Sequence, residues 1–137
     1  MFGFGMMYPW YEEYQVFTYK GETYWYQNKK LSRHDGPAVE LPGGRKEFWV
    51  NGKLHNLNGP ARNASSYDEY YVNGELHRED GPAIEYHDEK NKGYDTYFLR
   101  GKQLSKEQFD VAIAAQYRDG KVVELDGKKY KLTEIKD

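Results

Sequence analysis

The sequence contains no cysteine, and this absence excludes several kinds of chemistry. Disulfide bonds, cysteine-ligated zinc and thiol catalysis all need a residue that the chain does not have. No apolar run approaches the ~20 residues that would span a bilayer. The apolar start at residues 1–10 has no basic region, and acidic residues follow it at once, which argues against a secretory signal. We therefore expect a cytoplasmic protein with no membrane partner.

An excess of charge of either sign is also missing. The chain has 20 basic and 22 acidic residues, which gives a formal net charge of −2. A balance this even supplies no long-range attraction to nucleic acid or to anionic lipid. Glutamates are interleaved with the lysines of the predicted strands, so the aromatic residues there have no basic face on which to stack bases. Nucleic acid is therefore only a minor alternative as a partner.

Aromatic residues, by contrast, are abundant at 17% of the chain, and many of them fall within a tandem repeat. Residues 26–38, 49–61 and 71–83 align without gaps, and each segment ends in Gly-Pro-Ala. A fourth copy starts at Tyr97 and breaks off after Lys102. The prolines of the three complete units are 23 and 22 residues apart. This period indicates an array in which each unit packs mainly on its neighbours.

Each position of the unit has a structural interpretation. Aromatic and β-branched runs such as residues 48–50 and 70–72 predict strands. The Asn-Gly pairs at residues 51–52 and 73–74 predict tight turns with positive φ angles. A leucine recurs once per unit, as a stacked core position should: Leu31, Leu54 and Leu76. One unit is thus expected to form two antiparallel strands and a turn-rich crossing segment, and residues 15–100 a mainly β, antiparallel meander of hairpin repeats.

The two ends of the array are predicted to close it. Residues 15–19 and 23–26 are typical of a first hairpin. Ser105 and Gln108 form a capping-box pattern, which predicts a helix over residues 106–117. Residues 122–125 and 128–132 then predict a terminal hairpin around Asp-Gly. We expect one domain over residues 1–137, with an aromatic segment and hairpin at 1–23, the array at 24–104, and a helix and hairpin cap at 105–137.

The sequences Asn-Gly-Lys-Leu-His (51–55) and His-Arg-Glu-Asp-Gly-Pro-Ala (77–83) resemble a tandem-repeat family found widely in bacteriophage proteins of unknown function. Those repeats look like distant variants of MORN repeats, which are β-hairpin units. The resemblance covers about residues 24–110. It implies a β-hairpin array and, more loosely, a viral or bacterial source, and it implies no activity or cofactor. Unit one departs from the pattern at Asn28-Lys29 and Ser32, and unit two departs from it at Asn56.

His55 and His77 occupy the same position in two units, where a metal or acid–base site is one interpretation. Equivalent side chains in stacked units lie ~10 Å apart, whereas Zn–N bonds measure only ~2.0–2.1 Å. Two such ligands converge poorly on one ion. We therefore expect a polar ladder in which each histidine bonds the backbone or an aspartate of its own unit, and we expect no metal and no cofactor.

Arg33 and Arg78, with Asp35 and Asp80, could form an anion site or a hydrolase constellation. Catalysis needs a unique set of groups in one pocket, whereas these residues recur once per unit, as structural registry requires. We therefore expect Arg–Asp pairs that hold the crossing segments in shape. No phosphate loop or nucleophile elbow is present, which favours a protein that is not an enzyme. The alternative anion-binding set is Arg33, His55, His77 and Arg78.

The first 14 residues hold a dense group of aromatic and methionine side chains. They could fold over the first hairpin as a cap or dock on a partner, because Trp, Tyr and Met are enriched at interface cores. The candidate partner-binding residues are Met7, Tyr8, Trp10, Tyr11 and Tyr14.

The function that these observations favour is a non-enzymatic protein-interaction module. With the resemblance, we expect a phage-encoded accessory protein that binds and modulates a host protein, for instance in defence, or a viral protein in the host cytoplasm. Two alternatives stay open. One is the capture of a small anionic ligand such as a nucleotide signal, and the other is an enzyme whose site the sequence does not reveal.

Overall fold

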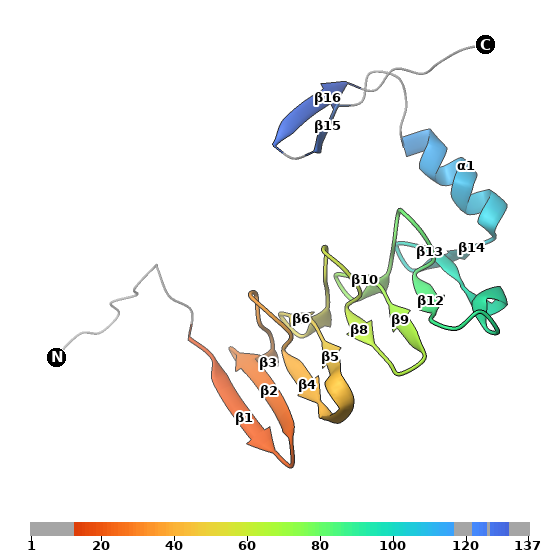
Figure 1. Ribbon diagram of the computed structural model, residues 1–137. Helices are drawn as coiled ribbons and strands as arrows, with labels where there is room; N and C mark the ends of the chain where they lie inside the picture. Colours follow the sequence, from red (N-terminus) through yellow and green to blue (C-terminus); the bar gives the residue numbers. More distant parts are fainter. Residues whose placement is uncertain (1–12, 117–121, 126, 132–137) are drawn as a thin grey trace, which may run out of the picture.

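An antiparallel sheet forms the main body of the computed structural model, which describes residues 13–116, 122–125 and 127–131 (Figure 1). Its strands follow the order β1-β2-β4-β5-β8-β9-β12, and β3 pairs with β2. The confirmed class is a mainly β meander of antiparallel hairpins. The strands of this sheet are β1 (Gln15–Tyr19), β2 (Glu22–Gln27), β3 (Lys30–Leu31), β4 (Val39–Leu41), β5 (Arg45–Glu47), β8 (Arg62–Asn63), β9 (Tyr67–Glu69) and β12 (Ile84–Tyr86).

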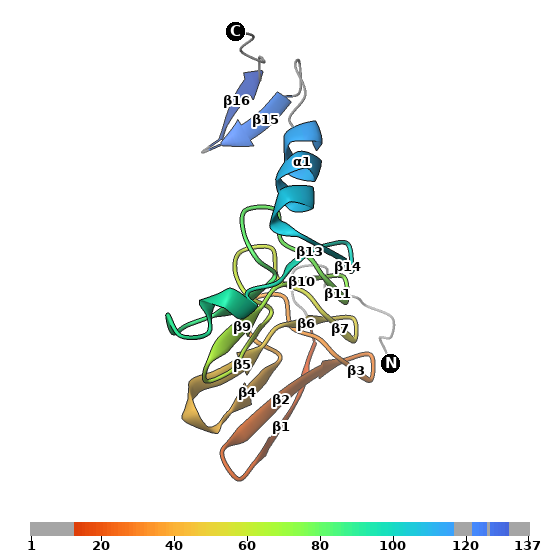
Figure 2. The same ribbon diagram turned by 90° about the vertical axis from the view of Figure 1, so that its right-hand side faces the viewer.

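The turns of units two and three and of the fourth copy build a second row of short hairpins, whereas the turn of unit one joins β2 and β3 in the main sheet. Each hairpin is a two-stranded sheet of its own, and Figure 2 shows the hairpins following one another along the main sheet. A unit thus supplies strands both to the main sheet and to the row of hairpins. The sequence analysis predicted a single meander and did not distinguish these two layers. The hairpins are β6 (Trp49–Val50) with β7 (Lys53–Leu54), β10 (Tyr71–Val72) with β11 (Glu75–Leu76), and β13 (Tyr97–Leu99) with β14 (Lys102–Leu104).

The predicted tight turns are present, with positive φ at both central residues. Asn51 and Gly52 have φ values of 51° and 78°, and the later turns repeat this pattern. Unit one makes the same turn without glycine, because Asn28 and Lys29 adopt φ values of 52° and 64°. A left-handed conformation costs an ordinary L-residue roughly 1–2 kcal/mol. The departure seen in the sequence at Lys29 is therefore tolerated at some cost in stability.

Main-chain hydrogen bonds tie each unit to the next. The turn glycine of one unit donates to the leucine carbonyl of the unit before it, and the residue that starts each crossing segment donates to the following hairpin. Every contact joins direct neighbours, as expected for a repeat array. The glycine bonds are Gly52–Leu31, Gly74–Leu54 and Gly101–Leu76, each 2.8 Å long, and the crossing bonds are Arg33–Trp49, Asn56–Tyr71 and Arg78–Phe98.

Small side chains occupy the centre of the array. The alanines of the three Gly-Pro-Ala endings, Ala38, Ala61 and Ala83, are completely buried. Each of their carbonyls accepts a main-chain bond from the aromatic residue before a hairpin, which brings two backbones close together. Of the three repeated leucines only Leu54 is buried, and Leu31 and Leu76 are half-buried. The close packing of backbones around alanine, more than the leucine stack, forms the core.

The helix α1 (Lys106–Gln116) follows the broken fourth copy. The capping box is formed in both directions, because Gln108 N–H donates to Ser105 Oγ (3.1 Å) and Ser105 N–H donates to Gln108 Oε1 (3.0 Å). Phe109 is buried against the ring of Tyr97, with centroids 4.8 Å apart. The predicted helix is thus present and contacts the last hairpin through Phe109, and its expected final residue, 117, lies outside the described residues.

Three short elements complete the described chain. These are the 3₁₀ turns η1 (Pro42–Gly44) and η2 (Lys92–Tyr94) and the predicted terminal hairpin, β15 (Val122–Leu125) with β16 (Lys128–Lys131). No helix in the described part of the chain is long and apolar enough to cross a membrane.

Candidate functional site

Arg33 and Arg78 each form the centre of the same small cluster. The guanidinium carbon of Arg78 lies 3.9 Å from the ring centre of Tyr70. Its Nε donates to Asp80 (2.8 Å), and its Nη1 donates to the Pro82 carbonyl (3.2 Å) and to Glu85 (2.6 Å). Burial opposes the charge of Arg78, but the bonds to Glu85 and Asp80 outweigh it and raise the guanidinium pKa above its ordinary value.

Unit one repeats this arrangement. Arg33 lies 3.8 Å from the ring centre of Trp25, and it donates to Asp35 (3.0 Å) and to the Pro37 carbonyl (3.2 Å). The predicted Arg–Asp pairs are therefore present, and each arginine also stacks on an aromatic ring. The aspartates are largely exposed, at 78% and 84%, so the ring and the carbonyl hold the guanidinium more firmly than the ion pair does.

Unit two has Asn56 where the other units have arginine, and the smaller side chain performs part of the same task. Its Nδ2 donates to the Pro60 carbonyl (3.0 Å), and its Oδ1 accepts from Asn58 N–H (3.0 Å). The amide therefore closes the crossing segment without an aromatic stack or an ion pair. The proline carbonyl of Gly-Pro-Ala thus accepts a side-chain hydrogen bond in all three units, from Arg33, Asn56 and Arg78.

A ladder of side-chain acceptors runs along the hairpin row. In each unit the side chain after the second hairpin strand accepts a main-chain N–H from the turn of the following unit. The expected polar ladder is confirmed. Its hydrogen bonds were expected within one unit, however, and they join neighbouring units instead. The pairs are Ser32 Oγ with Asn51 (3.1 Å), His55 Nδ1 with Asn73 (3.0 Å) and His77 Nδ1 with Arg100 (2.9 Å).

The bonds fix the tautomer of both histidines. An imidazole that accepts at Nδ1 and is neutral carries its proton on Nε2. In His77 this Nε2 lies 3.6 Å from Glu79 Oε1. Ser32 performs the same role as the histidines and is completely buried. The role therefore needs a hydrogen-bond acceptor, and a metal-binding imidazole is not required for it.

The alternative anion-binding residues are distributed along the array. His77 and Arg78 line a groove of about 690 Å³ between the crossing segments of units two and three, opposite Asn56–Gly59. Arg33 and His55 are not among the residues that line it. Each of the four side chains is bonded within the chain, and no cluster of three or more His, Asp or Glu residues able to hold a metal occurs in the described residues.

Tyr14 is the one described member of the proposed partner-binding set, since Met7, Tyr8, Trp10 and Tyr11 lie outside the described residues. Its ring packs edge-on against Trp25, with centroids 5.5 Å apart. Its hydroxyl accepts a bond from His34 N–H (3.2 Å). Tyr14 thus joins the start of the array to the first crossing segment and is half-buried there.

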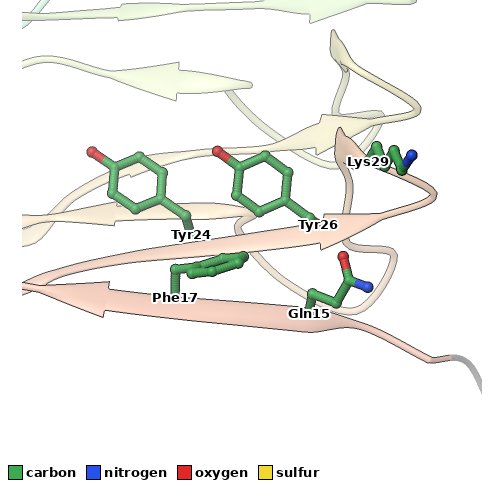
Figure 3. A pocket seen from close by; sticks show the side chains of 5 residues that line it. All are labelled: Gln15, Phe17, Tyr24, Tyr26 and Lys29. Carbon is green, nitrogen blue, oxygen red and sulfur yellow. The ribbon is translucent and has the colours of Figure 1, made fainter.

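An aromatic slot that the sequence analysis did not predict lies on the first hairpin, β1–β2. It has a volume of about 420 Å³ and is lined by Phe17, Tyr24 and Tyr26, with Gln15 and Lys29. Figure 3 shows the three rings on the same face of the hairpin. Phe17 and Tyr26 meet edge-on with centroids 5.6 Å apart. The period-2 alternation of these aromatics in the two strands was the signal that could have predicted it.

The slot is open and its outer wall is exposed. Phe17 is 59% exposed, and its strand neighbours Val16 and Tyr19 are 46% and 67% exposed. Tyr24 donates its hydroxyl hydrogen to Glu22 (2.6 Å), a bond that raises the phenol pKa above its ordinary value. Phe17 and Tyr19 therefore extend the apolar surface of the slot along one face of β1, and Val16 lies on the opposite face.

Comparisons of the chain with models of protein families, with curated proteins and with solved structures found no match.

Proposed function

We propose that the protein is a non-enzymatic interaction module that binds another protein chain through its first hairpin, β1–β2. The observation that carries this proposal is the exposed apolar surface of Phe17 and Tyr19 beside the aromatic slot. Aromatic side chains that are only partly covered in the free protein are typical hot spots of protein interfaces. Trp10 and Tyr11 come shortly before this hairpin in the sequence, and they stay candidate partner-binding residues.

The contacts of the repeated polar residues favour binding over chemistry. Arg33 and Arg78 donate to their own crossing segments, and His55 and His77 accept from their neighbours. Groups used in this way are structural, and catalysis would require free groups that converge on one point. The same bonds count against the capture of an anionic ligand by these four residues.

The test is a capture experiment with matched variants. Tagged full-length protein is incubated with bacterial host lysate, because the repeat resemblance points to a phage source, and captured proteins are identified by mass spectrometry. Phe17→Ala and Trp10→Ala should each weaken binding of a true partner by ~2 kcal/mol or more. Both variants should melt close to the parent.

Trp49→Ala is the contrast, because Trp49 occupies a repeated strand position and donates its indole N–H to Glu47 (2.9 Å). It should lower the free energy of unfolding by several kcal/mol and leave binding by the folded fraction intact. The proposal fails if Phe17→Ala and Trp10→Ala bind every captured protein as the parent does. If Trp10→Ala instead melts as early as Trp49→Ala and still binds, the first 12 residues serve the fold as a cap.

A further inference from the structure

The outer edge of β1 carries main-chain groups that point away from the sheet. Trp25 in β2 stands opposite Val16. The N–H of Trp25 donates to the Ala38 carbonyl (2.7 Å), and its carbonyl accepts from the Ser32 N–H (3.0 Å). Both main-chain groups of Trp25 therefore point away from β1. Val16 and Trp25 are therefore a pair that exchanges no main-chain bonds. By alternation, the N–H and C=O groups of Val16 and Thr18 face outward. No described strand lies beyond β1 in the sheet.

The opposite edge of the same sheet is closed by the chain itself. Ile84 in β12 exchanges main-chain bonds with Thr96 (3.1 and 3.0 Å). Tyr86 N–H donates to the side chain of Asp95 (2.8 Å). Proteins usually protect a free edge in this way, or with charged residues, proline or a bulge. The sequence of β1, Gln-Val-Phe-Thr-Tyr, has no charge and no proline, so it lacks those protections.

We propose that β1 pairs with β1 of a second copy of this chain, in an antiparallel arrangement with its two-fold axis at Phe17. This inference rests on the proposed function, because it names the partner that the same surface fits. Outward-facing groups can bond only to outward-facing groups. Val16 therefore stands opposite Thr18 of the second copy, and Thr18 stands opposite its Val16, so that each pair exchanges both main-chain bonds.

The register brings the exposed apolar side chains together. The two Phe17 residues face each other across the axis as a pair without main-chain bonds, where the α-carbons lie about 4.5 Å apart. Each ring is 59% exposed in the single copy, and pairing removes much of that surface from water. Aromatic pairs at such spacing attract each other beyond the effect of burial alone. The contact is self-complementary, as a two-fold interface must be.

The charge pattern of the strand agrees with this register. Residues 14–19 carry no charge. Like charges directly opposite one another would oppose a pairing, and none meet along the paired strands. The occupant that the edge fits is thus another copy of itself.

Single-cysteine variants test the register directly, because the natural chain has no cysteine. Phe17→Cys should form a disulfide-linked dimer of twice 16.2 kDa under mild oxidation, since paired β-carbons across the axis approach disulfide distance. Gln15→Cys and Tyr19→Cys lie on the same face and are matched controls. Neither should form a disulfide-linked dimer alone, and a mixture of the two should cross-link, because residue 15 stands opposite residue 19 of the second copy.

Thr18→Pro tests the main-chain bonds without cysteine. It removes an outward N–H that the β1–β2 pairing does not use, and proline is tolerated on edge strands in that position. In sedimentation experiments across protein concentrations, the parent should shift toward twice the monomer mass. Thr18→Pro should dimerise about tenfold more weakly or worse and melt close to the parent in dilute solution.

Three results would overturn the inference. The first is a parent that keeps the monomer mass at every concentration, and the second is Tyr19→Cys alone cross-linking as well as Phe17→Cys. The third is amide exchange at Val16 and Thr18 that is equally slow in dilute and concentrated protein, because the chain would then cover its own edge. A monomer that still captures another protein through Phe17 overturns the pairing and leaves the proposed function standing. A monomer that captures nothing overturns both.

Discussion

The guanidinium of Arg78 lies directly against Gly81, so that a β-carbon built on this glycine would be 3.1 Å from the central guanidinium carbon. The arginine is held between the ring of Tyr70 and the glycine backbone. Gly36 and Arg33 have the same relationship in unit one, at 3.0 Å. Neither glycine has a positive φ angle. The glycine of Asp-Gly-Pro is therefore required by the space the arginine takes and not by the turn.

Unit two supplies a matched control for this relationship. A β-carbon on Gly59 would find its nearest neighbour, Asn56 Nδ2, at 3.8 Å, which is ordinary contact. We expect Gly81→Ala to displace the guanidinium and to lower the free energy of unfolding by about 1–3 kcal/mol. Gly59→Ala should change it by less than about 0.5 kcal/mol or raise it slightly. Urea unfolding of the two variants measures the difference, and equal losses would contradict the packing argument.

The acceptor ladder predicts which substitutions at His77 are tolerated. His77→Ala leaves the Arg100 N–H without its acceptor and should cost about 1–3 kcal/mol of unfolding free energy. His77→Asn offers an oxygen in a similar position and should recover a large part of that loss. His87 pairs with Asp68 and is 43% exposed, so His87→Ala should cost only about 0–1 kcal/mol. The readout is thermal and urea unfolding.

Binding measurements separate structure from recognition at the same residue. Once the folded fraction is allowed for, His77→Ala should bind any captured partner as the parent does. A variant that melts normally and loses binding would assign His77 to the interaction surface.

Replacing Lys29 with glycine should make the protein more stable. It holds a φ of 64° at the position where units two and three have glycine. Lys29→Gly removes the cost of this conformation and should raise the free energy of unfolding by about 0.5–1 kcal/mol, after the greater flexibility of glycine in the unfolded chain is counted. Lys30→Gly, one residue further on in β3, is the control and should lower it by a similar amount. A loss at position 29 would show that the lysine side chain stabilises the turn in another way.

The partly buried Tyr70 and Tyr71 should make the protein less stable at alkaline pH. Burial raises the pKa of Tyr70 above 10.0, and the nearby Arg78 only partly offsets this. A phenol with a raised pKa in the folded state contributes stability that is fully present below the unfolded pKa and is lost as pH rises through the folded pKa. Stability should therefore fall above about pH 10.

The same effect operates at Tyr71, whose pKa burial also raises. Tyr70→Phe removes one ionising group and should make the stability curve flatter between about pH 10 and 11 than that of the parent. Tyr130 is exposed, so Tyr130→Phe serves as the control and should leave the curve unchanged. The measurement is urea unfolding at stepped pH, and identical curves for Tyr70→Phe and the parent would contradict the prediction.

The sequence by itself determined the array, because local chemistry defines each part of the unit. Asn-Gly demands positive φ angles, aromatic and β-branched runs favour strands, and Ser105 with Gln108 caps a helix. These patterns need only residues that are close in the chain. The hairpins, the single α-helix of the described chain and the terminal hairpin could be predicted for that reason. The repetition of arginine and aspartate at one spacing also indicated their pairing within a crossing segment.

Only the tertiary structure decided the contacts between units and the state of the edges. The ladder joins His77 to the next unit because stacking sets which N–H group comes within reach, and the sequence spacing does not contain that offset. The division into two layers and the outward groups of Val16 likewise depend on which strands pair. The aromatic slot missed in the sequence arises because Phe17 and Tyr26 lie on the same face across a strand pair, and no strand among the described residues covers them. Long-range pairing thus determines where this chain has a free surface.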